Sequence, residues 1–389
     1  GDIVDADREL LRAFDDRLTL LEQTYSDHRH EKLLRHTVIM AEELDGGVLA
    51  DAVEDRDAAE EVVGWINRTY DNEETNRDYR SVLRVFAKRV AGTEDSECPP
   101  AVDWVPTSTS SDYDPTPDPR EMLRWEDDVK PMIDAAINAR DAAMIALQFD
   151  AGLRASEFKS LRIGDIQNHD HGLQVTVDGA KQTNRRTIVL IPSVPWVNTW
   201  LDAHPDREDP EAPLWSKLQA AEPISDRMVS KALDEAAGRA EVSKPVTLTN
   251  FRKSSAAFLA SRNLNQAHIE DHHGWVRGSK AAARYIAVFG EDTDRELARL
   301  HGKDVSDEEP DSIAPIECIT CGRENDADAK FCQQCGQVLD PETAVDLEES
   351  EEDLETSLAE LPPEKAKKLL EISDVLDDPE VKRALLDSE

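Results

Sequence analysis

Residues 149–157 read Phe-Asp-Ala-Gly-Leu-Arg-Ala-Ser-Glu, and this stretch indicates the fold more strongly than any other. Apolar residues at helical spacing precede it, from Ala142 to Phe149, and they predict a buried helix. Gly152 interrupts that helix, and Arg154 follows shortly after. A guanidinium group is planar, permanently charged and able to bind two phosphate oxygens at once. Arg154 is therefore a candidate phosphate ligand, and the alternative is a surface arginine at the start of a helix.

The nine residues together resemble the Gly-Leu-Arg-x-Ser-Glu signature of the tyrosine recombinase (integrase) family. Leu161 and the tripeptide Gly164-Asp165-Ile166 fit the same pattern. The resemblance extends over about residues 6–302 and implies a mainly α fold with a small β-hairpin or sheet. In that family the signature arginine contacts the scissile phosphate, so the resemblance gives this role to Arg154.

A β-hairpin is predicted downstream. The β-branched runs Gln174–Val177 and Thr187–Ile191 are joined by a turn-rich stretch that holds Lys181. The arrangement resembles the family's hairpin, whose lysine protonates the leaving 5′ oxygen, and this implies a catalytic role for Lys181. A contact to the DNA backbone and an ordinary turn lysine are the alternatives.

The family's second signature is His-x-x-Arg-His within a helix, and Thr249 to Lys253 occupies the matching place. Arg252 matches the second phosphate-binding arginine, against the alternative of a solvated helix residue. Thr249 and Lys253 stand where the family has histidines, which weakens any assignment of an acid or base here. Lys253 could still offer positive charge to the phosphate, and Thr249 or Asn250 could cap the helix.

The third signature, Leu-Gly-His before the nucleophile, has a counterpart in His272-His273-Gly274-Trp275. Trp275 stands where family members have histidine or tryptophan, and it would donate its indole N–H to the phosphate. His273 or His272 could serve instead, unless both are exposed loop residues. Tyr285 is the candidate nucleophile, with a core tyrosine as the alternative. The resemblance implies a 3′-phosphotyrosine intermediate, which keeps the bond energy and needs neither ATP nor a catalytic cofactor.

Four cysteines predict a metal site. The pattern Cys318-x-x-Cys321 and Cys332-x-x-Cys335 is typical of two knuckles around one tetrahedral, structural Zn²⁺. Cys98 stands alone. The zinc ribbon could contact DNA or a protein partner, and the sequence does not choose between them.

The pattern of the whole chain predicts several parts. Helical periodicity near the N-terminus fits the family's core-binding half of a DNA clamp, where Tyr79, Arg80 and Arg84 are candidate phosphate contacts unless they belong to a solvated face. The expected division is a core-binding domain at 1–95, a linker at 96–119, a catalytic domain at 120–302, a linker at 303–315, a zinc ribbon at 316–340, and an acidic tail with a terminal helix at 341–389.

The net charge of −38 and the isoelectric point near 4.5 are unusual for a protein that binds nucleic acid. A disordered acidic protein is one interpretation. We favour a folded, halophilic protein of a haloarchaeal type, in which molar salt screens repulsion and local basic clusters such as 181–186 matter more than net charge. No segment predicts a membrane span or a signal peptide, so a cytoplasmic location is expected.

These features predict a site-specific recombinase or integrase that cuts and rejoins double-stranded DNA. The resemblance also implies a homotetramer on two DNA sites. A DNA-binding regulator that kept the fold and lost catalysis is the main alternative, suggested by Thr249 and Lys253. A protein-interaction module built on the ribbon and the tail is a third possibility.

Overall fold

The computed structural model describes residues 3–21, 24–91, 97–178, 185–290, 297–298, 300–303 and 312–345. The chain divides into two compact units, Gly1–Pro115 and Thr116–Glu389, and each has its own hydrophobic core. Lys181 and nearly all of the expected acidic tail, with its terminal helix, lie outside the described residues.

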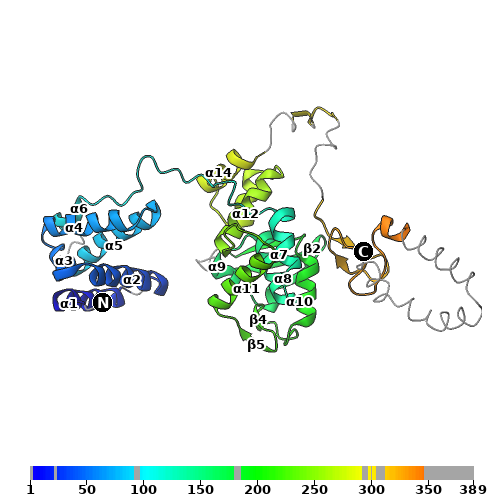
Figure 1. Ribbon diagram of the computed structural model, residues 1–389, viewed down its shortest axis with the longest axis horizontal. Coiled ribbons are helices and arrows are strands. Elements are labelled where there is room, and N and C mark those ends of the chain that lie inside the picture. The colour runs from blue at the N-terminus through cyan, green and yellow to red at the C-terminus, as the bar shows by residue number, and fades with distance from the viewer. Residues whose placement is uncertain are drawn as a thin grey trace, which may run out of the picture. The chain divides into compact units, whose positions relative to one another are not determined.

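The first unit is a bundle of amphipathic helices (Figure 1). Side chains of Ser26, Asp55 and Asn72 cap three of its four long helices at their N-termini. Phe14 and Phe86 meet edge to face at its centre, with ring centroids 5.2 Å apart. The helices are α1 (Asp5–Leu20), α2 (Asp27–Glu43), η1 (Asp45–Gly47), α3 (Val48–Asp51), α4 (Arg56–Thr69), α5 (Glu73–Val90) and α6 (Pro100–Asp103).

Arginines on α5 hold the segment that follows this bundle. Arg80 donates to the carbonyl oxygens of Pro106 at 2.8 Å and Ser108 at 3.2 Å, and Arg84 donates to the carbonyl of Val105 at 3.0 Å. Tyr79 and Arg80 are buried. Tyr79 lies among other aromatic rings, so these side chains are part of the unit's interior. The alternative in which Tyr79 and Arg80 belong to a solvated face is therefore wrong, whereas their contact with phosphates stays a prediction.

Helices surround the buried helix α8 (Ala139–Ala151) in the second unit. Its side chains are buried along most of its length, which explains its nearly continuous run of apolar residues. The other helices of this unit are η2, a π-helical turn (Trp125–Val129), α7 (Lys130–Asp134), α9 (Ala155–Lys159), η3 (Ile163–Asp165), α10 (Val194–Ala203), α11 (Asp226–Arg239), α12 (Leu248–Ser261), α13 (Gln266–His273) and α14 (Lys280–Phe289).

The predicted hairpin is part of a larger sheet. β1 (Ile166–His169), β2 (Gly172–Val177) and β3 (Arg186–Leu190) form an antiparallel sheet in the order β1-β2-β3, in which Val175 pairs with both Ile166 and Ile188. The expectation of a single hairpin missed β1, whose polar residues do not alternate clearly with apolar ones. It also missed the two-stranded sheet of β4 (Ser216–Lys217) and β5 (Ala220–Pro223).

The N-cap of α12 lies two to three residues before the expected position at Thr249 or Asn250. Thr247 is the N-cap, and its side chain accepts a hydrogen bond from the backbone N–H of Asn250 at 3.1 Å. Thr249 and Asn250 therefore lie inside the first turn, and the expectation that one of them caps the helix is wrong. Among the described residues, no helix combines the length and the apolar character that crossing a membrane requires.

Candidate active site

Gly152 turns the chain sharply between α8 and α9 and so places Arg154. It adopts the left-handed conformation, with φ of 55°, and caps the C-terminus of α8. A Cβ at this position would lie 2.6 Å from Nε2 of His273 and 2.8 Å from Oγ of Ser255, so only glycine fits here. The carbonyl of Gly152 accepts a hydrogen bond from Nη1 of Arg252 at 2.7 Å. This one turn therefore brings the two sequence-predicted arginines to the same place.

Glu157 joins Arg154 to Arg186, an arginine that the sequence interpretation left without a role. Oε1 of Glu157 accepts from Nη1 of Arg154 at 2.7 Å and from Nη1 of Arg186 at 2.9 Å, and Oε2 accepts from Nη2 of Arg186 at 2.9 Å. Burial raises the pKa of the Glu157 carboxyl, but the two arginines outweigh burial and lower it to about 2. Glu157 therefore stays ionised between two positive charges.

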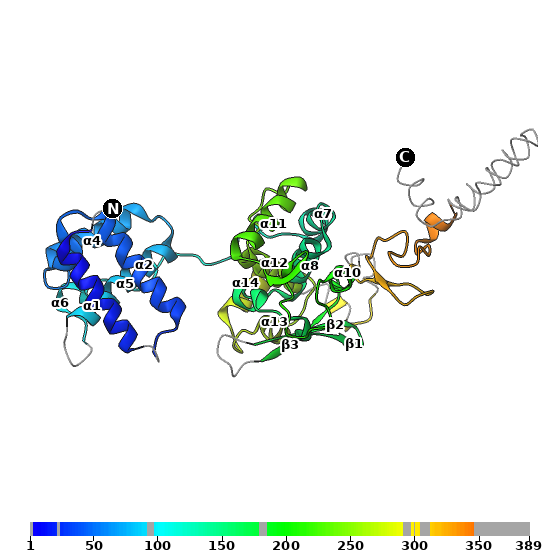
Figure 2. The same cartoon turned by 90° about the horizontal axis from the view of Figure 1, so that it is seen from below.

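Three consecutive carbonyl oxygens at the C-terminus of α13 each hold a different arginine. The carbonyl of His272 accepts from Nε of Arg186 at 3.2 Å, and the carbonyl of His273 accepts from Nη2 of Arg252 at 2.6 Å. The carbonyl of Gly274 accepts from Nη2 of Arg154 at 2.9 Å. The last carbonyls of a helix lack partners within the helix and carry partial negative charge. They are therefore natural acceptors for guanidinium groups, and Figure 2 shows α13 beside β3, from which Arg186 comes.

A ladder of stacked rings leads to Tyr285. The rings of His273 and Trp275 are stacked with centroids 4.9 Å apart, and those of Trp275 and Tyr285 are stacked at 5.8 Å. The guanidinium carbon of Arg252 lies 5.4 Å from the centre of the Trp275 ring. Tyr285 is on α14 and is only 8% exposed. The structure thus brings Arg154, Arg252, Trp275 and Tyr285 together, as the sequence predicts.

Burial sets the protonation of the site, and the charges of the arginines modify it. Burial raises the pKa of the Tyr285 phenol to about 12, although the charges of Arg252 and Arg284 oppose this. Burial, together with the charge of Arg154, lowers the pKa of Arg252 to about 9. The tyrosine is neutral at rest, and a phosphate near these arginines would find positive charge beside the phenol.

The two histidines lie on helix α13, not in an exposed loop, so the loop alternative is wrong. Nε2 of His272 is 2.9 Å from the carbonyl oxygen of Asp150, and burial lowers the pKa of His272 to about 4. His273 is fully buried, burial holds its pKa well below the usual value, and its Nε2 has no hydrogen-bond partner within the described residues. Both rings are therefore neutral near pH 7 and pack against the site.

The remaining candidates lie less centrally. Lys253 is exposed on α12, and Thr249 is exposed in the first turn of that helix. Lys181 falls outside the described residues, so the structure does not place it. The sequence interpretation missed Arg186, although the sequence carries a signal for it. Arg186 shares one face of β3 with the buried residues Ile188 and Leu190. An arginine that alternates in phase with core residues needs a buried partner, and Glu157 is that partner.

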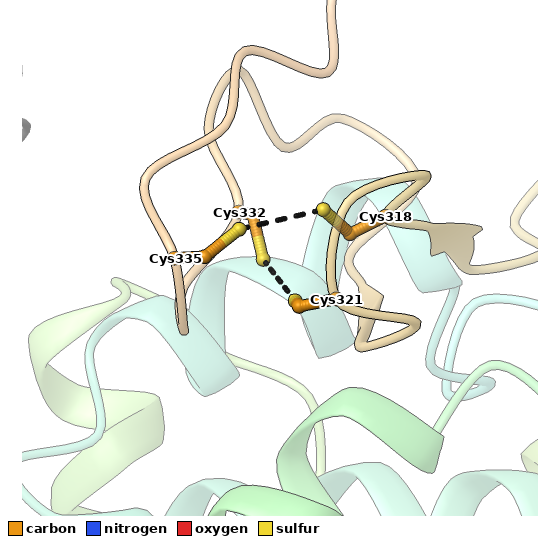
Figure 3. Close-up of side chains that lie close together, drawn as sticks. All are labelled: Cys318, Cys321, Cys332 and Cys335. Atoms are coloured by element: carbon orange, nitrogen blue, oxygen red, sulfur yellow. Dashed lines mark hydrogen bonds between the residues drawn. The ribbon is translucent and has the colours of Figure 1, made fainter.

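The four predicted cysteines form a compact cluster (Figure 3). Sγ of Cys318 lies 3.5 Å from Sγ of Cys335, Sγ of Cys321 lies 3.6 Å from Sγ of Cys332, and all four sulfurs lie within 4.8 Å of one another. Four thiolates bound to one ion at about 2.3 Å stand about 3.8 Å apart in a tetrahedron. The cluster therefore fits a single metal ion. Short strands β6 (Ile316–Glu317) and β7 (Glu324–Asn325) support it.

The cysteine-bearing segment contacts α7 and α10 of the second unit. Nη1 of Arg323 lies 2.6 Å from a carboxylate oxygen of Asp202 on α10. Nζ of Lys130 lies 3.0 Å from a carboxylate oxygen of Asp326 and 3.4 Å from one of Asp328. Lys130 and Asp326 are both mostly buried, with side chains 15% and 13% exposed. The segment is therefore packed onto the unit and not tethered loosely beside it.

Comparison with known proteins identifies the family. A family model described as the phage integrase family matches residues 125–291. Tyrosine recombinase XerC of Vibrio campbellii is 27% identical over 138 residues, which cover 36% of this chain and 44% of the relative. XerC of Methylobacterium nodulans is 31% identical over 138 residues, which cover 34% of this chain and 41% of the relative. The chain therefore spans less than half the length of these curated relatives.

Solved structures show the same fold. A lambda integrase tetramer bound to a Holliday junction superposes with a TM-score of 0.55 at 16% identity, covering 74% of this chain and 79% of that one. A lambda integrase dimer bound to a COC′ core site gives a TM-score of 0.54 at 15% identity and covers 79% of each chain. The mainly helical fold with small sheets, expected from the sequence, is confirmed. Residues 125–291 therefore match the phage integrase family, and the curated relatives that this part of the chain resembles are tyrosine recombinases.

Proposed function

We propose that this protein is a site-specific recombinase or integrase that cuts and rejoins double-stranded DNA. The observation that carries the proposal is the convergence of Arg154, Arg252 and Trp275 beside Tyr285, a buried tyrosine in a surrounding of positive charge. The nearby histidines are buried and neutral and Glu157 is ion-paired, whereas the guanidinium groups and the indole N–H can bind a phosphodiester. The solved structures with this fold that hold DNA add support from analogy.

The reaction follows from the roles of these groups. Arg154 and Arg252 bind the non-bridging oxygens of the scissile phosphate and stabilise the charge of the pentacoordinate state. The phenol oxygen of Tyr285 releases its proton to solvent and bonds to phosphorus, while the bond to the 5′ oxygen breaks. Trp275 directs its indole N–H to the phosphate, and Lys181 protonates the departing 5′ oxygen. Attack by a 5′ hydroxyl reverses these steps and rejoins the strand.

The other parts of the chain have proposed roles as well. The first unit serves as the core-binding half of a DNA clamp, and a homotetramer assembles on two sites. The four cysteines bind a structural Zn²⁺ through Cys318, Cys321, Cys332 and Cys335, because their sulfurs have the separation that tetrahedral thiolate ligation requires. The ribbon so formed packs on α7 and α10, which leaves its outer surface for DNA or a protein partner. We place the reaction in a cytoplasm of high salt, in keeping with the net charge of −38.

One observation favours a second function. Thr249 is exposed where the family's second signature has a histidine, and both histidines near the site are buried and neutral. A chain without a charged histidine at the phosphate could bind DNA as a regulator without cutting it.

Covalent trapping separates the two functions. The protein is incubated in molar KCl with fragments of its own genome, and the mixture is quenched with detergent before protein-linked DNA is measured. The recombinase function predicts an adduct that is absent from Tyr285→Phe, and sequencing the trapped DNA gives the target site. Specific gel shifts without any adduct would instead establish the regulator.

A further inference from the structure

Arg186 has the contacts of a residue that holds other groups in place. Its side chain is only 12% exposed, and both of its terminal nitrogens reach Glu157, whose side chain is 2% exposed. Its third nitrogen donates to the carbonyl of His272 at 3.2 Å. Three of the five N–H groups of Arg186 are used within the protein, and its burial leaves little of the guanidinium group facing solvent.

Gly274 lies directly against Arg186. A Cβ at position 274 would come within 2.8 Å of Nη1 and 3.0 Å of Cζ of that arginine. Gly274 has φ of 59°, and its carbonyl is the acceptor that holds Nη2 of Arg154. Arg186 therefore supports both acceptors of Arg154, which are the Glu157 carboxylate and the Gly274 carbonyl.

Charge gives the second reason for this arrangement. Arg154 and Glu157 alone would form a neutral pair, in which the carboxylate competes with DNA for the guanidinium group. Because Arg186 binds the same Glu157 carboxylate, the three side chains together carry a net positive charge. The two carboxylate oxygens are then divided between Arg154 and Arg186. Arg154, whose side chain is 38% exposed, can then turn part of its donor set towards a phosphate.

We propose that Arg186 is a positioning residue, which orients Arg154 towards the scissile phosphate by holding Glu157 and the C-terminus of α13. The inference rests on the proposed function and adds to it a residue outside the signature motifs. Arg186 acts through other groups and does not touch the substrate, so its loss alters the rate of strand cleavage more than the affinity for DNA.

The test uses the full chain with Arg186→Gln, Arg186→Lys and the neighbouring control Arg185→Gln. Arg185 is exposed and contacts only Asp178, at 3.8 Å, among the described residues, so its loss removes one charge without disturbing Glu157. The rate of phosphotyrosine formation is measured at saturating DNA, and the dissociation constant is measured on the same site. Arg186→Gln is expected to lower the rate about 100-fold and to leave the affinity unchanged. Arg186→Lys, which keeps the charge but not the two-oxygen contact, is expected to recover about 10-fold of this loss.

A pH profile supplies a readout that a purely structural role would not change. In wild type, Glu157 remains ionised throughout the range in which DNA is stable. In Arg186→Gln its pKa rises, so the cleavage rate should fall as pH drops below about 5 while the wild-type rate does not.

Two outcomes overturn the inference in distinguishable ways. Equal adduct rates in wild type and Arg186→Gln, or equal losses of rate and affinity in the Arg186 and Arg185 variants, would exclude a positioning role while leaving the recombinase function intact. No adduct with wild type would overturn the proposed function itself and the inference with it.

Discussion

Arginines in the two units are held by the same kind of bond but serve different ends. In the first unit, Arg80 and Arg84 donate to backbone carbonyls of residues 105–108 and secure the segment that follows the bundle. In the second unit, three arginines donate to the consecutive carbonyls of residues 272–274, and the charge of one of them, Arg252, acts on Tyr285. Backbone carbonyls thus fix the guanidinium groups in both places.

The two groups of arginines differ in how much of the guanidinium group stays exposed after these bonds form. Arg80 is 9% exposed, and its donors are satisfied by its own chain. Arg154 also has two partners, Glu157 and the carbonyl of Gly274, yet its side chain stays 38% exposed. Under the proposed function, a place beside the candidate nucleophile, and not helical spacing, distinguishes an arginine that binds substrate from one that binds its own fold.

Arg154→Ala is expected to have the largest effect. Loss of one charged donor to the developing phosphate charge should lower the rate of adduct formation about 1000-fold. The free energy of unfolding should change little, because Glu157 keeps its contacts with Arg186. Rapid-quench trapping at saturating DNA gives the rate, and urea denaturation gives the stability.

Arg162→Ala is the matched control, since Arg162 is an exposed arginine nearby whose side chain pairs with the surface carboxylate of Glu211. It should retain the wild-type cleavage rate. If Arg154→Ala lost stability and kept its rate, Arg154 would resemble Arg80, and the contrast between the two units would disappear.

His272 should make the second unit sensitive to acid. Burial lowers the pKa of His272 to about 4 in the folded state, whereas the unfolded chain binds the proton near pH 6.5. The unfolded state therefore takes up a proton first as pH falls from about 6.5 to 4, and folding stability decreases by ~3 kcal/mol. Asp150, whose pKa burial raises to about 6, opposes this change in wild type.

His272→Gln separates the two groups, because glutamine can keep the hydrogen bond to the Asp150 carbonyl and cannot titrate. Urea denaturation of both proteins between pH 7 and 4 should show the difference in unfolding free energy shift in favour of the variant on acidification. Parallel pH dependences would mean that His272 is not buried as a neutral ring. The cleavage rate of wild type should show no step near pH 6.5.

Arg80→Ala should destabilise the first unit without slowing chemistry. The carbonyls of Pro106 and Ser108 lose their donor, which costs about 1–3 kcal/mol when such groups remain partly buried. Hydrogen exchange of the amides in α5 should accelerate, while Arg12→Ala, on an exposed position of α1, should not change it. A slower cleavage rate at saturating DNA, with α5 equally protected, would show that Arg80 contacts substrate after all.

Local sequence patterns predicted much of the site because its main groups lie next to helix and turn signals. Gly152 predicts the turn that exposes Arg154. Arg252 lies about one helical turn after the start of α12. Tyr285 lies on a helix of strong amphipathic pattern. Each of these positions depends on contacts between residues that are close in the sequence, or on a motif of several residues.

The remaining features of the site could not be predicted because they depend on pairs of residues that are far apart in the sequence. Arg186 meets Glu157 across 29 positions and His272 across 86, and no local rule joins them. The burial of Arg80 was missed for the same reason, since its backbone acceptors lie on a segment that helical periodicity does not describe. The neutral state of His272 and His273 also follows from burial by distant elements, which a motif does not reveal.

Removing the metal from the ribbon should have the smallest effect. It tests whether the ion pairs between the ribbon and the helices of the second unit also stabilise the fold. Arg323 and Lys130 form ion pairs between the cysteine-bearing segment and helices α10 and α7. Ion pairs with partial exposure contribute up to about 1 kcal/mol each. Removal of the metal should unfold the ribbon and release these pairs, so the amides of α10 should exchange about fivefold faster, which corresponds to about 1 kcal/mol.

Chelator treatment of wild type and the Cys335→Ser variant should give the same acceleration in α10, and Cys98→Ser should give none, because Cys98 belongs to the first unit and is not a member of the cluster. A metal assay of the purified protein identifies the ion. If α10 were equally protected with and without metal, the ion pairs would not couple the ribbon to the unit. Lys130 and Arg323 would then resemble ordinary surface charges, and their ion pairs would not stabilise α7 or α10.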